Sequence, residues 1–482
     1  MKGASNASGC TLPRRLGLAG ALIAIAIAFT LFRPPPTQGP FGRDFEAYYA
    51  AGATWNAGGD PWSRAIWQVE RTIDGVDRSR DELLPYVGPA AALPLFGALA
   101  RLPHSLAVRW WTALMILALG ALVAASLTLA GVRRGWPLLS GVLFAISAGP
   151  MTSAIGLGQV ALIAAAGIAC ALVAYERGTI AAGAFGTLLA GLQPNLALTL
   201  VARMRDRVAW ISAIAGAAAF AVFTLAAGGG VAGLAAYVHR LGEHGRAEAF
   251  DAIQHTPAAI LWSLGVAPQS ASALGIAIAL ATVAAVAAVT VRLRLDALNG
   301  TLLAMAALPF AVPFFHEHDF LIEVIPLLVL GARTGGAVRA CAGIAAALVL
   351  VDWFGVAQRG PGQAQILTLG FAVACAFAAV GPGARMRRSD FAAFATLALA
   401  TCVALPLAHA APAPTWPDGL PAGYRAPAAA DASAVWADEQ RATGLDARVP
   451  AWGALRALPL AGCIVLGTAI ALAGRRNRGV AG

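Results

Sequence analysis

Apolar stretches close to twenty residues long recur from one end of this 482-residue chain to the other. A bilayer core about 30 Å thick takes roughly 20 apolar residues per helix, so each stretch has the length of one crossing. Charged residues make up 12% of the chain and hydrophobic residues 59%, whereas a soluble domain carries about 25% charged residues. These stretches exclude a single water-soluble core and predict an all-α integral membrane protein, a polytopic helical bundle.

Twelve stretches are predicted to span the membrane, and a further one, 179–203, is predicted to be a hairpin broken at Pro194. The predicted spans lie near 16–32, 106–130, 137–155, 158–175, 207–227, 270–291, 298–314, 319–332, 337–352, 363–380, 390–408 and 454–473. This arrangement puts every arginine cluster on one face, which the positive-inside rule makes cytoplasmic, together with both termini. The arginines that give the net charge of +10 therefore orient the spans, and they do not indicate nucleic-acid binding.

The predicted topology divides the chain into five parts. These are a cytoplasmic N-terminus with the first span (1–33), a first outer loop (34–105), the helical bundle (106–408), an Ala/Pro-rich outer loop (409–453), and the last span with a basic cytoplasmic tail (454–482). A second outer segment, 228–269, interrupts the bundle. Lys2 is the only lysine, and with the many Ala and Gly codons this indicates a GC-rich bacterium and its inner membrane.

Two carboxylates, Asp44 and Glu46, follow closely behind the first predicted span. A short amphipathic helix ended by Gly58 and Gly59 would hold them at the membrane surface. Burial near lipid raises the pKa of a carboxyl, which improves it as an acceptor of a hydroxyl proton at neutral pH. The alternative is a solvated acidic loop. The apolar stretch 84–102 contains three prolines and is predicted to be a short re-entrant or interfacial helix.

The run FHEHDF (315–320) interrupts two apolar stretches, and charged groups at membrane depth normally face protein or a water-filled cavity. Three interpretations stay open for His316, His318 and Asp319: contact with a phosphate or hydroxyl group, a solvated outer turn, or a divalent metal site. Gln159 could bind a sugar or cap a turn. Gln193, beside Pro194, belongs either to a site or to a structural kink.

The two later outer segments also leave alternatives open. His239, His244, His255 and Glu248 could serve a site or lie in a solvated loop. The aromatic residues of the last outer loop, including Trp416 and Trp436, could stack on sugars or sit in a flexible linker.

Several short motifs, in this order, resemble glycosyltransferase family 87. They are DFEAYYAAG (44–52), GGDPW (58–62), PYVGPAAAL (85–93), GQV (158–160), QP (193–194) and FHEHDF (315–320). The family consists of GT-C-type membrane enzymes, including polyprenyl-phosphate-mannose-dependent mannosyltransferases. The sequence departs from the family at Ala161, where Asn is usual, and at Gln193, where Lys is usual.

The resemblance implies transfer of a mannose-like hexose or a pentose from a polyprenyl-phosphate donor to a lipid-linked or cell-envelope glycan, at the outer face of the membrane and with inversion. It implies that Asp44 is the general base and that His318 helps to hold the donor phosphate. Because the lysine is missing, Arg43 is the local candidate for the phosphate countercharge.

The remaining expected substrate contacts are Glu46, Tyr86, Gln159, Gln193, His316 and Asp319. No cofactor is expected, and a metal is not favoured. The expected partners are the bilayer, the donor lipid and the acceptor. A transporter or flippase of lipid-linked sugars is the alternative, although the polar residues gather at one face and the two halves show no repeat.

Overall fold

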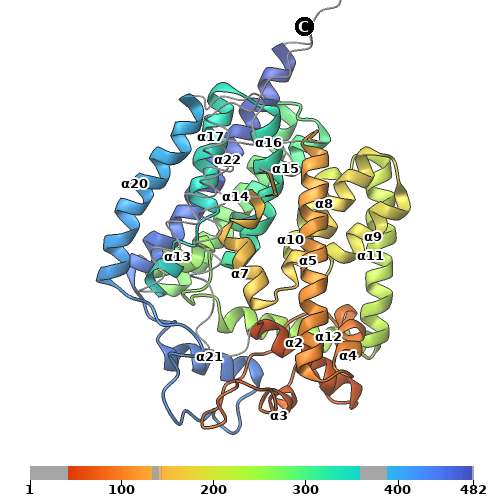
Figure 1. Ribbon diagram of the computed structural model, residues 1–482, viewed down its shortest axis with the longest axis vertical. Helices are drawn as coiled ribbons and strands as arrows, with labels where there is room; N and C mark the ends of the chain where they lie inside the picture. The colour runs from red at the N-terminus through yellow and green to blue at the C-terminus, as the bar shows by residue number, and fades with distance from the viewer. Residues whose placement is uncertain (1–41, 133–140, 143, 359–387, 480–482) are drawn as a thin grey trace, which may run out of the picture.

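The computed structural model describes residues 42–132, 141–142, 144–358 and 388–479. Within these ranges the chain forms helices and their connections, and no strand occurs. Most helices run along the long axis of the molecule, and a layer of shorter helices closes one end (Figure 1). The predicted all-helical architecture is therefore confirmed for the described residues.

Five helices are long and apolar enough to cross a membrane, among the residues that the structure describes. They are α5 (His104–Leu129), α11 (Arg207–Ala227), α14 (Pro268–Arg292), α20 (Arg388–Ala410) and α22 (Pro450–Gly479). Each coincides with a predicted span. The predicted spans near 16–32 and 363–380 lie outside the described residues, and the count of twelve is not confirmed.

Shorter helices fill the bundle between these five. They are α7 (Gly149–Leu157), α8 (Ala161–Glu176), α9 (Ile180–Ala190), α10 (Pro194–Ala197), η2 (Leu198–Arg203), α13 (Pro257–Ser263), α15 (Ala297–Ala311), η3 (Glu317–Glu323), α16 (Val324–Arg333), α17 (Gly336–Val349) and α18 (Gly355–Gln358). The helical break predicted at Pro194 is present, because α9 ends at Ala190 and α10 begins at Pro194.

Small residues bring α8 and α9 into close contact. A Cβ added at Gly167 would lie 2.7 Å from the Gly186 carbonyl oxygen, and one added at Gly186 would lie 2.6 Å from the Gly167 oxygen. Helices inside a membrane gain little from the hydrophobic effect between them, so close backbone approach through glycine is their means of packing.

The layer at the end of the bundle contains α2 (Arg43–Asn56), α3 (Ala65–Glu70), η1 (Ala90–Ala92), α4 (Leu93–Leu99), α12 (Gly230–Ala247) and α21 (Ala432–Thr443). These helices come from the three segments predicted to be outer loops. The segments bind one another: the Asp81 N–H donates to the Tyr424 carbonyl (2.9 Å), and Arg64 donates to the carbonyls of Pro427 and Ala428 (2.7 Å each). The last segment is thus folded onto the first, and α21 is an ordered helix capped by Asp431.

Candidate functional site

The Asp44 carboxylate lies in the first turn of α2, where the Gln159 side-chain amide donates to its Oδ2 atom. Gln159 also accepts a hydrogen bond of 2.9 Å from the Tyr48 hydroxyl, one turn further along α2. Helix α2 and Gln159 are far apart in the sequence, and the fold alone brings them together. The pair Asp44 and Gln159, both named from sequence, forms the first half of the site.

Two glycines in left-handed conformations make this approach possible. Gly42 (φ 87°) precedes α2 and its N–H donates to the Gly156 carbonyl at 3.1 Å, which ties the start of α2 to the end of α7. Gly158 (φ 74°) ends α7, and its carbonyl accepts from the Trp111 indole at 2.8 Å. Because L-residues with a Cβ rarely adopt such φ values, glycine at both positions fixes Asp44 against Gln159.

Asp44 is partly accessible, yet protein atoms surround it closely. Burial raises the pKa of Asp44 to about 6, against the lowering effects of the Gln159 hydrogen bond and of His316 and Arg43. A carboxyl with this pKa is ionised at neutral pH and is a stronger proton acceptor than an ordinary aspartate.

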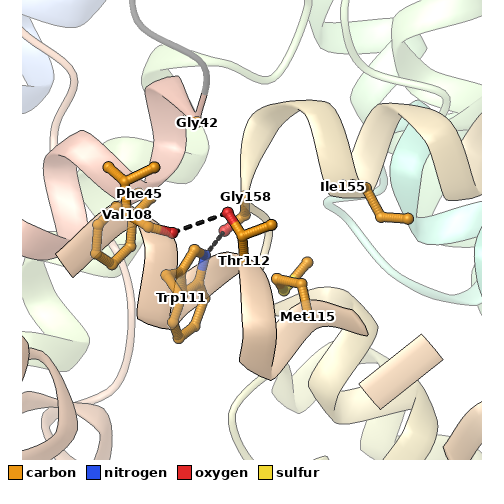
Figure 2. A pocket seen from close by; sticks show the side chains of 8 residues that line it. All are labelled: Gly42, Phe45, Val108, Trp111, Thr112, Met115, Ile155 and Gly158. Atoms are coloured by element: carbon orange, nitrogen blue, oxygen red, sulfur yellow. Dashed lines mark hydrogen bonds between the residues drawn. The ribbon is translucent and has the colours of Figure 1, made fainter. Parts of the chain in front are cut away.

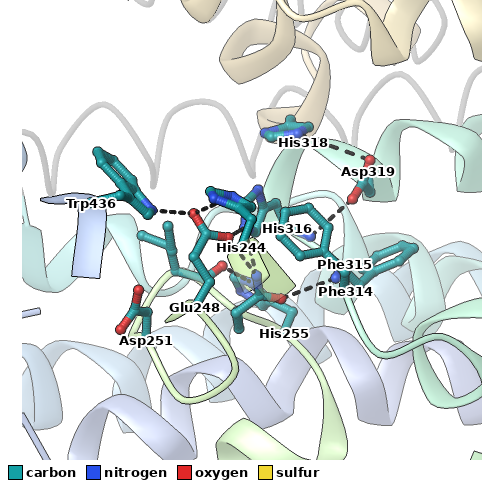
Figure 3. Close-up of polar contacts among 12 residues, drawn as sticks. His244, Glu248, Asp251, His255, Phe314, Phe315, His316, His318, Asp319 and Trp436 are labelled. Atoms are coloured by element: carbon teal, nitrogen blue, oxygen red, sulfur yellow. Dashed lines mark hydrogen bonds and ion pairs between the residues drawn. The ribbon is translucent and has the colours of Figure 1, made fainter. Parts of the chain in front are cut away.

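The second half of the site is built around Glu248, which follows α12 (Figure 3). Its carboxylate lies 3.3 Å from the ring nitrogen of His244 and 3.3 Å from that of His316. It also accepts hydrogen bonds from the Gln254 amide (3.0 Å) and from the Trp436 indole of α21. An isolated antiparallel bridge between Gln254 and His316 holds the two segments in register.

This arrangement creates a buried ion pair. Burial disfavours charge on Glu248, but His244 and His316 outweigh it and hold the pKa of Glu248 below its usual value. Burial likewise lowers the pKa of His316, but Glu248 more than offsets this effect and the net pKa is raised. The ion pair therefore favours the imidazolium form of His316, which is close enough to Asp44 for each to influence the other's ionisation.

His318 has a different environment, although it is only two residues away. Its side chain is buried, and burial followed by the nearby positive charge of His316 lowers the pKa of His318 well below the usual value. A neutral imidazole is a weaker partner for a phosphate dianion than an imidazolium. The geometry thus favours His316 for the role that the family resemblance implied for His318.

Asp319 links the helical break to this site. Its Oδ1 atom accepts from the Gln193 amide at 3.3 Å, and its Oδ2 atom accepts from the His316 backbone N–H at 3.0 Å. Asn195, on α10, donates to the Phe314 carbonyl at 3.3 Å. Of the two interpretations of the break, this geometry favours a part of the site, because the break turns Gln193 and Asn195 toward the 314–319 segment.

Arg43 and Glu46 lie next to Asp44 but are engaged with each other. The Arg43 guanidinium lies 3.0 Å from Glu46 and 2.8 Å from Glu82, and it stacks over the Trp416 ring at 4.9 Å. Two carboxylates already neutralise this cation, so its surroundings do not favour it as the phosphate countercharge. Tyr86 is buried, with its hydroxyl donating to the Pro89 carbonyl at 2.9 Å.

Sequence reasoning left the second outer segment open between a site and a solvated loop. The structure buries His244, Glu248, Asp251 and His255, each at most 4% exposed, which excludes the solvated loop for these residues. The spacing of His244 and Glu248, four residues apart along the chain, was the available signal. Nothing in the sequence pointed to the Trp436–Glu248 hydrogen bond.

A small apolar cavity of about 10 Å³, room for one water molecule, lies beside Phe45 (Figure 2). It is lined by Gly42, Phe45, Val108, Trp111, Thr112, Met115, Ile155 and Gly158. Phe45 directly follows Asp44, and the Trp111 and Met115 side chains come from α5, a helix long enough to span the membrane. The cavity therefore lies between α2, α5 and α7.

Among the described residues, no group of three or more His, Cys, Asp or Glu side chains has the arrangement of a metal site. The buried polar residues around Asp44 and Glu248 are engaged with one another instead.

Comparison with known proteins identifies one family. The model of Glycosyltransferase family 87 matches residues 86–315, a range that includes Gln159, Gln193 and Glu248 and ends one residue before His316. No curated protein and no solved structure matches the chain. The match bears out the resemblance of the short motifs, and the long apolar helices agree with it. Over residues 86–315, this helical chain is similar to glycosyltransferase family 87.

Proposed function

We propose that the protein transfers a mannose-like hexose or a pentose from a polyprenyl-phosphate donor to a lipid-linked or cell-envelope glycan, at the outer face of the cytoplasmic membrane. The observation that carries this proposal is the position of Asp44. It is a partly accessible carboxylate of raised pKa, close enough to His316 for each to influence the other's ionisation.

The donor suits this position for a chemical reason. Nucleotide sugars belong to the cytoplasm, so an enzyme at the outer face needs a sugar carrier that has crossed the bilayer. A polyprenyl phosphate meets this need: its tail stays in the bilayer, and its phosphate reaches His316.

The reaction is a single displacement. Asp44 accepts the proton of the acceptor hydroxyl, the hydroxyl oxygen bonds to the anomeric carbon, and the bond from that carbon to the phosphate oxygen breaks. Polyprenyl phosphate leaves, and the configuration at the anomeric carbon inverts. His316 stabilises the charge on the departing phosphate, while Glu248 keeps His316 protonated. Gln193, held by Asp319, binds a hydroxyl group of the sugar.

Membrane vesicles given radiolabelled polyprenyl-phosphate sugars, one sugar at a time, test the proposal. Wild-type protein transfers label from one donor to an acceptor, and Asp44→Asn does not, while both bind the donor lipid. Glu46→Gln is the matched control, because it changes a neighbouring carboxylate on the same helix. Equal transfer by wild type and Asp44→Asn would refute the proposal.

A further inference from the structure

Helix α12 begins directly where α11, a helix long and apolar enough to cross a membrane, ends. After Ala227 the chain turns sharply, because Gly229 (φ 82°) and Gly230 (φ 76°) adopt left-handed conformations that favour glycine. Gly233 then packs so closely on the Gly228 carbonyl that a Cβ at this position has no room. The first turn of α12 is therefore held at the end of α11, in the layer of shorter helices that closes the bundle (Figure 1).

One side of α12 is covered by protein. Tyr237 and His244 are at most 8% exposed, and the Tyr237 hydroxyl donates to the Val87 carbonyl at 3.3 Å. Arg240 lies 2.6 Å from the Asp60 carboxylate. Positions 237, 240 and 244 are three or four residues apart and so share one side of the helix. This side packs on the other outer segments.

The rest of the α12 surface contains a strip without any charge, which we call the apolar strip. It follows the helical spacing of three or four residues. Its members are Val231, Leu234, Ala235, Val238, Leu241, Gly242 and Gly245. Val231, Val238 and Leu241 are 75%, 59% and 43% exposed, so the protein leaves the large side chains of this strip uncovered.

Beside the apolar strip lies a charged strip formed by His239, Glu243 and Arg246. His239 and Glu243 are 3.1 Å apart, and their side chains are 72% and 30% exposed. A helix that faces only water carries polar residues across its whole exposed surface, whereas a helix at a bilayer surface separates an apolar face from a charged one. The three sides of α12 therefore match three surroundings: protein, acyl chains and water.

The position of the apolar strip favours lipid over a protein partner. Ile214, Val222 and Phe223 of α11 are 52%, 65% and 48% exposed, which is the surface that a membrane-spanning helix presents to lipid. The strip begins at Val231, only four residues after α11 ends at Ala227. Lipid that covers the end of α11 is thus adjacent to the start of the strip, and a soluble partner would have to displace it.

We infer that α12 lies in the surface of the bilayer, with the apolar strip buried at the boundary between headgroups and acyl chains. The buried side of α12 carries His244, and Glu248 follows the helix, so both lie at the depth of lipid phosphate groups. This depth suits the lipid-phosphate donor proposed above. The inference itself does not rest on glycosyl transfer and is measured without it.

The test uses the full-length protein in nanodiscs of phosphatidylcholine and phosphatidylglycerol, with its six native cysteines replaced by alanine and one nitroxide-labelled cysteine introduced at a time. At Val231→Cys, Val238→Cys and Leu241→Cys, collisions with O₂, which concentrates among acyl chains, are expected to exceed collisions with a water-soluble nickel chelate. His239→Cys and Glu243→Cys are the matched controls on the same helix, and the opposite order is expected there.

A membrane-impermeant maleimide provides a second measurement, in protein that keeps its native cysteines. Val238→Cys is expected to react at least about tenfold more slowly than His239→Cys, because a thiol in apolar surroundings is poorly ionised. Denaturation in SDS should make the two rates equal. Nickel accessibility or maleimide rates that are equal in the two strips of the folded protein would overturn the membrane contact. A disulfide between two chains through Val238→Cys, with the label there shielded from O₂ and nickel alike, would overturn it in favour of a second copy.

Discussion

Two carboxylates on the same helix, Asp44 and Glu46, have opposite surroundings. Burial raises the pKa of both, to about 6 for Asp44 and about 7 for Glu46. Asp44 has a single amide partner and stays partly accessible, next to His316. Glu46 is 2% exposed and lies 3.0 Å from Arg43.

The surroundings of Glu46 form what we call the Arg43 cluster. Its members are Arg43, Glu46, Glu70, Glu82 and Glu439. Burial raises the pKa of Glu439 to about 9, so this group is protonated at neutral pH, and burial also raises the pKa of Glu70 well above its usual value. The comparison teaches that burial alone does not make a catalytic base: access and an open acceptor position distinguish Asp44 from the carboxyl groups of the Arg43 cluster.

The largest expected effect comes from Asp44→Asn. Loss of the general base should reduce kcat about a thousandfold, whereas Glu46→Gln should keep kcat within about tenfold. Ionised Asp44 costs stability above pH 6, because its pKa in the folded protein is raised above 3.8, and the amide removes this cost. The melting temperature of Asp44→Asn in detergent should therefore equal or exceed that of wild type. A thousandfold loss of kcat in Glu46→Gln, with full activity in Asp44→Asn, would make Glu46 and not Asp44 the general base.

We expect Arg43→Met to lower the stability of the fold more than it changes the rate of the chemical step. It leaves Glu46 buried without a cation, while Glu82 keeps Arg80 at 2.7 Å, and removal of one partner from a buried ion pair costs about 3–5 kcal/mol. Thermal unfolding of the purified protein measures this loss, with Arg78→Gln, on the exposed surface of the same segment, as the control. A normal melting temperature combined with a strongly raised donor KM would instead assign Arg43 to the donor phosphate.

Glu248→Gln should weaken donor binding by about tenfold, because His316 loses the carboxylate that keeps it protonated. The pKa of His316 should fall, and the alkaline limb of the pH profile should move to lower pH. Glu243→Gln is the matched control, since Glu243 pairs with His239 (3.1 Å) on the exposed side of α12. An unchanged alkaline limb in Glu248→Gln would separate His316 from the reaction.

The smallest expected effect is a shift in the pH dependence of the transfer rate. The rate should rise with pH as Asp44 ionises and should be half-maximal at pH about 6. Gln159→Leu removes the hydrogen bond that lowers the pKa of Asp44, so the acid limb should move to higher pH. Initial rates between pH 5 and pH 9 measure both limbs, and an acid limb that Gln159→Leu leaves in place would assign it to another group.

Part of this site could be predicted from the sequence. Asp44, Gln159 and the 315–320 run stand out because polar residues are costly near a membrane, and the structure brings them to one end of the bundle. The five long helices follow from hydropathy alone, since length and apolar composition are local properties. The shorter helices that fill the bundle fall below that length, so hydropathy cannot decide whether each one crosses the membrane.

The partners of the charged groups could not be predicted. Arg43 binds Glu82, 39 residues away, and Glu248 binds Trp436, 188 residues away, and only the packing of the outer segments decides such pairs. His316 and His318 are equivalent in sequence. They differ because Glu248 lies 3.3 Å from His316, which favours the imidazolium form of that histidine, whereas burial lowers the pKa of His318.

The hydrogen bond from Trp436 to Glu248 joins the last outer segment to the second one. Ribosomes deliver these segments in order, so the carboxylate beside His316 lacks its indole partner until Trp436 has been synthesised. The second half of the site, around Glu248, is thus completed late in biogenesis. Unfinished chains in the translocon lack the hydrogen bond from Trp436 to Glu248.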